Sequence, residues 1–131
     1  CNTIIFSKSG TQILSNSGTV SNINYTINNS STLTINNNIN IDASRAFSLY
    51  GTIYFGSYIL SGNGNFSLGS GGTIGIGSSG GISGISLTGN IQNTGTRIFS
   101  SEANYFYNGS VPQITGDGLN PIVNNITFSN S

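Results

Sequence analysis

A short motif recurs at nearly constant spacing along the first part of the chain. A threonine followed by alternating apolar residues begins at Thr11, Thr32, Thr52 and Thr73. Each of these threonines follows the previous one at a step of about 20 residues. A period of about 20 to 50 residues is the signature of a repeat architecture, in which each layer buries its apolar face only against its neighbours. No other feature constrains the fold as strongly.

A second set of apolar residues keeps the same spacing. Its members come in pairs with one residue between them, so both side chains of a pair project to one side of a strand. The pairs are Tyr25 with Ile27, Phe47 with Leu49, Phe66 with Leu68, Ile85 with Leu87, Tyr105 with Tyr107, and Ile126 with Phe128. Two sets with one spacing predict at least two short strands in every layer.

A longer repeat is superimposed on the short one. Residues 6–30 match residues 107–131 at an offset of 101, with Gln12-Ile13 aligned on Gln113-Ile114 and Thr26 on Thr127. We interpret residues 1–131 as a single segment, which holds one repeat of about 101 residues and the start of the next.

The short repeat predicts an all-β chain folded as a parallel β-solenoid, or β-helix, with coils of about 20 residues. More than half of the chain is Ser, Asn, Gly or Thr, which form helices poorly. The expected core stack places Ile13, Leu33, Ile53 and Ile74 in successive coils about 4.8 Å apart. An antiparallel β-sandwich is the alternative, because short strands separated by turn residues are typical of it as well.

Charged residues are scarce and balanced. Three Lys or Arg residues stand against three Asp or Glu residues, and together they make up 5% of the chain. Binding to nucleic acid needs a basic patch, which so few Lys and Arg residues cannot form, so we expect no nucleic-acid partner. No run approaches the roughly 18 apolar residues that a membrane-spanning helix needs, so no membrane span is expected.

The residues that carry catalysis are few and scattered. Asp42 precedes Glu102 by about three coils, and Asp117 follows Glu102 by less than one coil, which does not predict a catalytic cluster. The chain has no His and one Cys, which excludes a transition-metal site in practice. We therefore predict no catalytic residue, no metal and no cofactor.

Two surface features are candidates for binding. Tyr54 and Tyr58 alternate out of phase with neighbouring apolar residues, so an exposed Tyr there could stack on a sugar ring, although a half-buried Tyr is the commoner outcome. The threonines at positions 11, 32, 52 and 73 would form a ladder at coil spacing, as in ice-binding solenoids. Those usually carry a double Thr-x-Thr row, which only Thr32-x-Thr34 and Thr94-x-Thr96 supply here.

Several stretches resemble the repeat unit of very large surface proteins of Bacteroidota-type bacteria. They are residues 72–77, 89–97, 103–110, 113–121 and 123–127, rich in Asn, Ser, Thr and Gly. The resemblance covers residues 60–131 well and the remainder more loosely. It implies a β-strand-repeat adhesin, secreted by the type IX route and located outside the cell or on its surface.

These observations predict a non-enzymatic structural or adhesive segment of a cell-surface stalk or filament. Open ends of a solenoid expose unpaired strand edges, so the expected partner is the protein itself, by head-to-tail stacking or tandem repeats. The alternative is a module that binds surface glycans or ice on a flat face. For Cys1 three interpretations remain open: the edge of a fragment, the lipidated first residue of a lipoprotein, and a tag or linkage site.

Overall fold

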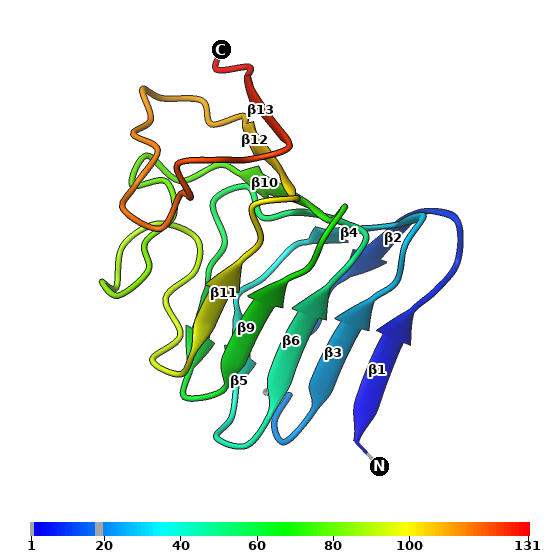
Figure 1. Ribbon diagram of the computed structural model, residues 1–131. Helices are drawn as coiled ribbons and strands as arrows, with labels where there is room; N and C mark the ends of the chain where they lie inside the picture. Colours follow the sequence, from blue (N-terminus) through cyan, green and yellow to red (C-terminus); the bar gives the residue numbers. More distant parts are fainter. Residues whose placement is uncertain (1, 18–19) are drawn as a thin grey trace.

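The computed structural model describes residues 2–17 and 20–131, and these residues contain no helix (Figure 1). Cys1, and with it every interpretation of that residue, lies outside the described residues. Short strands follow one another closely from β1 to β10, and strand-free stretches of turns and bends separate β10 from β11 and β12 from β13.

The strands form three sheets. The five-stranded sheet has the order β1 (Thr3–Phe6), β3 (Asn24–Ile27), β6 (Ala46–Leu49), β9 (Asn65–Leu68) and β11 (Arg97–Phe99). The six-stranded sheet has the order β13 (Asn125–Phe128), β12 (Asn104–Tyr107), β10 (Thr73–Ile76), β7 (Thr52–Tyr54), β4 (Ser31–Ile35) and β2 (Gly10–Leu14). The third sheet pairs β5 (Ile39–Ile41) with β8 (Leu60–Gly62), and an isolated bridge joins Leu60 to Ile91.

Every strand pair in these sheets is parallel. The chain visits the sheets in a fixed order, so that β3, β4 and β5 make one coil and β6, β7 and β8 make the next. Strands of one sheet lie side by side along the solenoid, as the five-stranded sheet shows in Figure 1. The predicted parallel β-solenoid, with coils of about 20 residues, is confirmed, and the antiparallel sandwich is excluded.

The core consists of rows of side chains that stack from coil to coil. Leu33 pairs with Ile53 and Ile53 pairs with Ile74, and all three side chains are fully buried. Removing a side chain of this size from water contributes about 1.5–3 kcal/mol. The predicted core stack is therefore present in these three coils.

The prediction that Ile13 begins this stack is wrong. Gln12 is the residue opposite Leu33, and Ile13 lies opposite Thr34. Ile13 is the second residue after Thr11, whereas Leu33 is the first residue after Thr32. A shift of one residue turns a side chain to the other face of a strand. Ile13 consequently lies on the outer face, with 64% of its surface exposed.

An aromatic row fills the core beneath the five-stranded sheet. The ring centroids of Tyr25 and Phe47 are 5.5 Å apart, and those of Phe47 and Phe66 are 6.0 Å apart. Phe99 continues the row at 5.6 Å from Phe66. The sequence pattern placed Ile85 and Leu87 in this position, and that expectation is wrong.

The cause is a coil that is longer than the others. Asn38 bonds to Ile59 across a regular coil, a separation of 21 residues, whereas Asn65 bonds to Thr96 across the long coil, a separation of 31 residues. All three sheets make this long step, from Leu60 to Ile91, from Leu68 to Phe99 and from Ile74 to Tyr105. The additional residues lie between β10 and Ile91, and we call residues 79–89 the inserted segment.

The inserted segment forms an additional layer on the third side of the solenoid. The backbone N–H of Ile82 donates to the carbonyl of Thr115 at 3.1 Å, and the N–H of Asn90 donates to the carbonyl of Gly81 at 3.4 Å. Ile82 is fully buried between its two neighbouring layers, while Ile85 and Leu87 project into solvent with exposed fractions of 87% and 60%.

The inserted segment also changes the meaning of the 101-residue offset. Tyr25 lies in β3 of the five-stranded sheet, but its match in the longer repeat, Ile126, lies in β13 of the six-stranded sheet. Matching residues at this offset therefore occupy different faces of the solenoid.

Asparagines tie neighbouring coils together at the corners. The side chains of Asn37 and Asn16 are hydrogen-bonded across one coil, and Asn37 Oδ1 also accepts the backbone N–H of Asn16 at 3.0 Å. The Oδ1 atoms of Asn24 and Asn65 accept backbone N–H groups of the following coil in the same way, each at 3.0 Å. Corner amides of this kind satisfy backbone groups that the sheets leave unpaired.

Candidate functional site: the outer face of the six-stranded sheet

The outer face of the six-stranded sheet carries a straight row of threonines. Thr11, Thr32, Thr52 and Thr73 are mutual partners in the register of β2, β4, β7 and β10. The hydroxyls of Thr11, Thr32 and Thr52 make no hydrogen bond to any other described residue, and Thr73 Oγ1 accepts only from Asn104 at 3.4 Å. We call these four residues the threonine row. Strand spacing places their hydroxyls about 4.8 Å apart.

A second row runs beside the threonine row, two positions later in each strand. Its members, which we call the mixed row, are Ile13, Thr34, Tyr54, Gly75, Phe106 and Thr127. Only β4 therefore carries two adjacent threonines, Thr32 and Thr34, on this face of the described sheet. The double row typical of ice-binding solenoids is not formed.

Two aromatic rings and a glycine form the centre of the mixed row. Tyr54 lies opposite Gly75, which lies opposite Phe106. A Cβ at Gly75 would collide with Tyr54 Cδ1, so the ring of Tyr54 occupies the space that a side chain there would need. The rings of Tyr54 and Phe106 meet edge to face, with centroids 6.2 Å apart and an interplanar angle of 77°.

Tyr58 does not join this surface. It follows β7 in the turn that leads to β8, and its side chain is half-buried against the core. Its backbone carbonyl accepts from Asn90 Nδ2 at 2.7 Å. Tyr54 and Tyr58 thus lie on different sides of the solenoid, and the aromatic partner of Tyr54 is Phe106.

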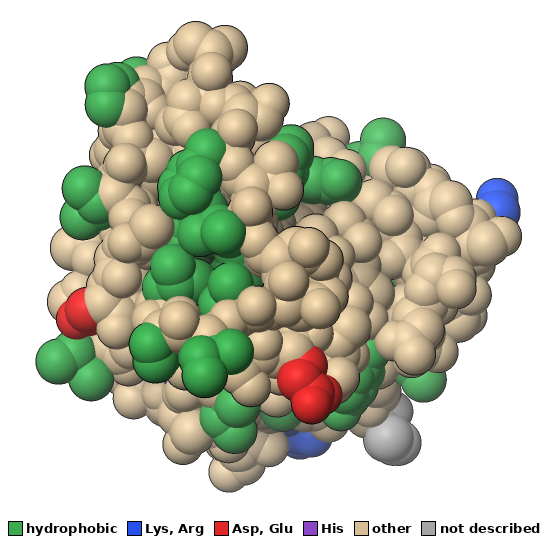
Figure 2. Space-filling view, turned by 45° about the horizontal axis from the view of Figure 1, so that its top comes forward, with side chains coloured by type: hydrophobic (Ala, Val, Ile, Leu, Met, Phe, Trp, Pro, Cys, Tyr) green, Lys and Arg blue, Asp and Glu red, His purple; other side chains and the backbone are tan. Residues whose placement is uncertain are grey.

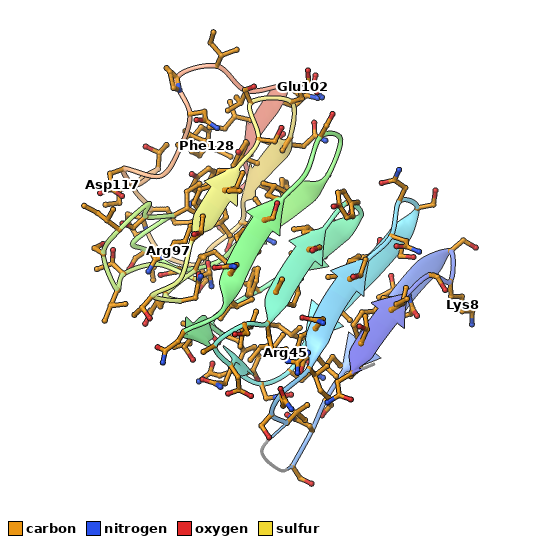
Figure 3. The ribbon with its side chains drawn as sticks, turned by 60° about the horizontal axis from the view of Figure 1, so that its bottom comes forward. Lys8, Arg45, Arg97, Glu102, Asp117 and Phe128 are labelled. Carbon is orange, nitrogen blue, oxygen red and sulfur yellow. The ribbon has the colours of Figure 1, made fainter. Side chains whose placement is uncertain are left out.

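The three acids each have a separate structural partner. Asp42 accepts the backbone N–H of Asn22, Glu102 Oε2 accepts from Ser70 Oγ at 2.7 Å, and Asp117 Oδ1 accepts the N–H of Gly84 at 3.0 Å. Figure 3 shows Glu102 and Asp117 at separate corners of the molecule. Hydrogen bonds from Ser83 and Gly84 hold the pKa of Asp117 below its usual value. In the described part of the chain no three potential metal ligands of the His, Cys, Asp and Glu types come together.

Arg97 anchors the inserted segment. Its Nη1 donates to the carbonyls of Ser83 at 2.8 Å and Ser86 at 2.7 Å, and its Nε donates to the carbonyl of Asn93 at 2.7 Å. Burial lowers the pKa of Arg97, which Asp117 partly offsets, but a guanidinium remains charged in proteins. A cavity of about 360 Å³ lies beside it, lined in part by Ile85, Leu87 and Thr94.

Tyr105 and Tyr107 differ from Tyr54 in where their hydroxyls point. Tyr105 donates to the carbonyl of Ser100 and Tyr107 donates to the carbonyl of Thr115, both at 2.7 Å. Burial raises the pKa of Tyr105 to about 12 and raises that of Tyr107 further. The Tyr54 hydroxyl bonds to no other described residue and is not buried.

Sequence reasoning found the threonine row and Tyr54 but missed Gly75 and Phe106. The long coil lies between Tyr54 and Phe106, so a constant step of about 20 residues does not point from one to the other. The sequence shows that residues 105–107 are aromatic, but it does not show which sheet they join.

No family model, curated protein or solved structure matches the chain. Nothing helical in the described residues has the length and hydrophobicity that crossing a membrane would require.

Proposed function

We propose that this chain is a non-enzymatic structural segment of an extracellular β-solenoid stalk or filament, with an adhesive role at a bacterial cell surface. The observation that carries the proposal is the exposed apolar end of the solenoid at β13. Ile126 and Phe128 continue the buried rows of Tyr105 and Tyr107, yet 39% and 56% of their surfaces are exposed.

This end is built like an interior layer. Phe128 stacks on Tyr107 with centroids 5.1 Å apart and an interplanar angle of 24°, as one core ring stacks on the next. Hydrophobic side chains gather where this end of the molecule faces the viewer in Figure 2. A further coil, in the same polypeptide or in another copy, would bury these rings and pair the free edge of β13.

The chemistry of the described residues supports a structural role. The acids are dispersed, each accepting a hydrogen bond from a neighbouring layer, and asparagine side chains add further bonds between coils. The resemblance of residues 60–131 to bacterial surface repeats supports the extracellular location and the adhesive role.

Light scattering at increasing protein concentration tests the proposal. We expect end-to-end multimers for the parent chain, and a monomer for Phe128→Ser, because a polar residue there removes the apolar contact. Ile98→Ser is the matched control, since Ile98 is 54% exposed but points outward from the side of the five-stranded sheet, whereas Phe128 continues a core row. A parent chain that stays monomeric, or multimers that Phe128→Ser leaves intact, would contradict the proposal.

A further inference from the structure

We propose that the outer face of the six-stranded sheet binds a neutral polysaccharide chain lying along the solenoid axis. Tyr54 and Phe106 would provide its apolar contact, and the threonine row would provide its hydrogen bonds. This site is independent of the end-to-end stacking proposed above, because it lies on the side of the solenoid.

The mixed row supplies a surface for the C–H faces of sugar rings. Gly75 leaves room for the ring of Tyr54 to lie over the backbone of the next coil and to meet the Phe106 ring edge to face. Tyr54 and Phe106 are both half-buried, which fixes their orientation and leaves part of each ring accessible. A fixed aromatic ring offers a large contact area at a low cost in conformational entropy.

The threonine row supplies the polar half of the surface. The hydroxyls of Thr11, Thr32 and Thr52 have no partner among the described residues, and a hydroxyl can both donate and accept. They repeat along the same direction as the mixed row. An extended polymer with hydroxyls along one edge and C–H groups on its faces matches this pair of rows.

Charge selects among polymers of this shape. Neither the threonine row nor the mixed row contains a charged residue. Binding an anionic polymer would need basic partners, and burying its charges without them is costly. The face therefore favours a neutral polysaccharide over an acidic one.

Regularity argues against ice as the ligand. Tyr54 and Phe106 stand in the row where an ice-binding surface would continue with threonines, and Gly75 between them has no side chain. A row of such unequal side chains does not present a repeating lattice of hydroxyls.

Binding of the intact chain to cellulose, chitin, xylan and mannan, with alginate as the anionic comparison, tests the proposal. We expect binding to at least one of the four neutral polymers, and a loss of affinity of about tenfold in Tyr54→Ala and in Phe106→Ala. Thr32→Val combined with Thr52→Val, which removes two hydroxyls, should weaken binding by a smaller factor.

Tyr50→Ala is the matched control. A Cβ at Gly69 would come within 2.5 Å of Tyr50 Cδ1, so this ring also lies over a glycine of the next coil, but it stands at a corner outside both rows and is 46% exposed. Its removal should leave affinity unchanged, and thermal melting confirms that every variant is folded. Failure to bind all four neutral polymers, binding to alginate alone, or full affinity in folded Tyr54→Ala and Phe106→Ala would overturn the proposal. If the parent chain shapes ice crystals and binds no polysaccharide, ice binding would replace the polysaccharide proposal.

Discussion

The regular coils between β3 and β10 and the long coil after β10 solve the same packing problem in different ways. In the regular coils, each residue of a row lies about 20 residues from its partner, and like side chains stack directly. In the long coil the partner lies 31 residues away in all three sheets. The register is kept in all three sheets, because the additional residues are confined to one added layer on the third side of the solenoid.

The long coil keeps the stacking and adds specific polar bonds to it. At the core-facing position opposite Phe66 it carries Arg97, whose guanidinium binds two carbonyls within the inserted segment and the carbonyl of Asn93 just after it. The next strand of the six-stranded sheet holds Tyr105 and Tyr107, which donate to backbone carbonyls outside their own strand. A regular repeat can thus accept about ten more residues if a few long polar side chains satisfy the displaced backbone.

The largest expected effect comes from placing the same charge in each of the two regions and comparing the loss of stability. Ile53→Asp buries a charge with no basic partner in a regular coil and should lower the free energy of unfolding by about 4 kcal/mol or more. Ile85→Asp places the same charge on the exposed tip of the inserted segment and should change it by less than about 0.5 kcal/mol. Urea denaturation followed by circular dichroism measures both. Equal losses would show that the two regions do not differ in this way.

Removal of the Arg97 side chain should destabilise the long coil selectively. Arg97→Ala leaves three carbonyls without their donor, and we expect a loss of about 2 kcal/mol. Hydrogen exchange should accelerate in residues 79–96 and remain slow in β4 and β7. Arg97→Lys should not restore protection, because one ammonium group does not reproduce the guanidinium geometry.

The control for this experiment is Arg45→Ala, which removes a single bond, from Nε to Asn22 Oδ1 at 2.7 Å. It should alter stability by less than about 0.5 kcal/mol. Uniform acceleration of exchange across the whole chain in Arg97→Ala would contradict a local role for Arg97.

Alkaline pH should destabilise the folded chain through Tyr105 and Tyr107. Burial raises the pKa of both groups above 10, so the unfolded chain loses these protons at lower pH than the folded chain does. Their contribution is fully present below pH 10 and is lost as pH rises towards the folded pKa, which is about 12 for Tyr105. Melting temperatures from pH 8 to 12 should fall less steeply in Tyr105→Phe, and an unchanged slope would count against this assignment.

The smallest effect concerns slow chemistry rather than folding. Gln113 Oε1 accepts the backbone N–H of Gly109 at 2.7 Å, and this nitrogen is the atom that would attack the Asn108 side chain in deamidation. Gln113→Ala frees it, so mass spectrometry after prolonged incubation should find more Asp at position 108. Asn63 is the internal reference, because the N–H of Gly64 is held by the Ile41 carbonyl at 2.8 Å in either variant. Equal deamidation at Asn108 in parent and variant would show that Gln113 does not protect it.

The sequence alone determined the architecture and much of the regular half. The spacing of Thr32, Thr52 and Thr73 predicts the coils, because stacked parallel strands require equal numbers of residues per turn. It also predicts the burial of Leu33, Ile53 and Ile74, since alternation within a strand fixes which side chains face inward. The scarcity of charge is likewise a property of composition and needs no coordinates.

Only the tertiary structure decided how the rows continue. The apolar pattern favours Ile13 for the inward position, but the hydrogen-bond register with β4 places Gln12 there. Residues 85–87 and 105–107 also fit, but the inserted segment lengthens the step and sends one set into solvent and the other into the six-stranded sheet. Periodicity predicts which residues can pair. The position of an insertion depends instead on where extra residues can be added while all three sheets keep their hydrogen bonds. For the same reason, the contact of Tyr54 with Phe106 across Gly75 could be seen only once the chain was folded.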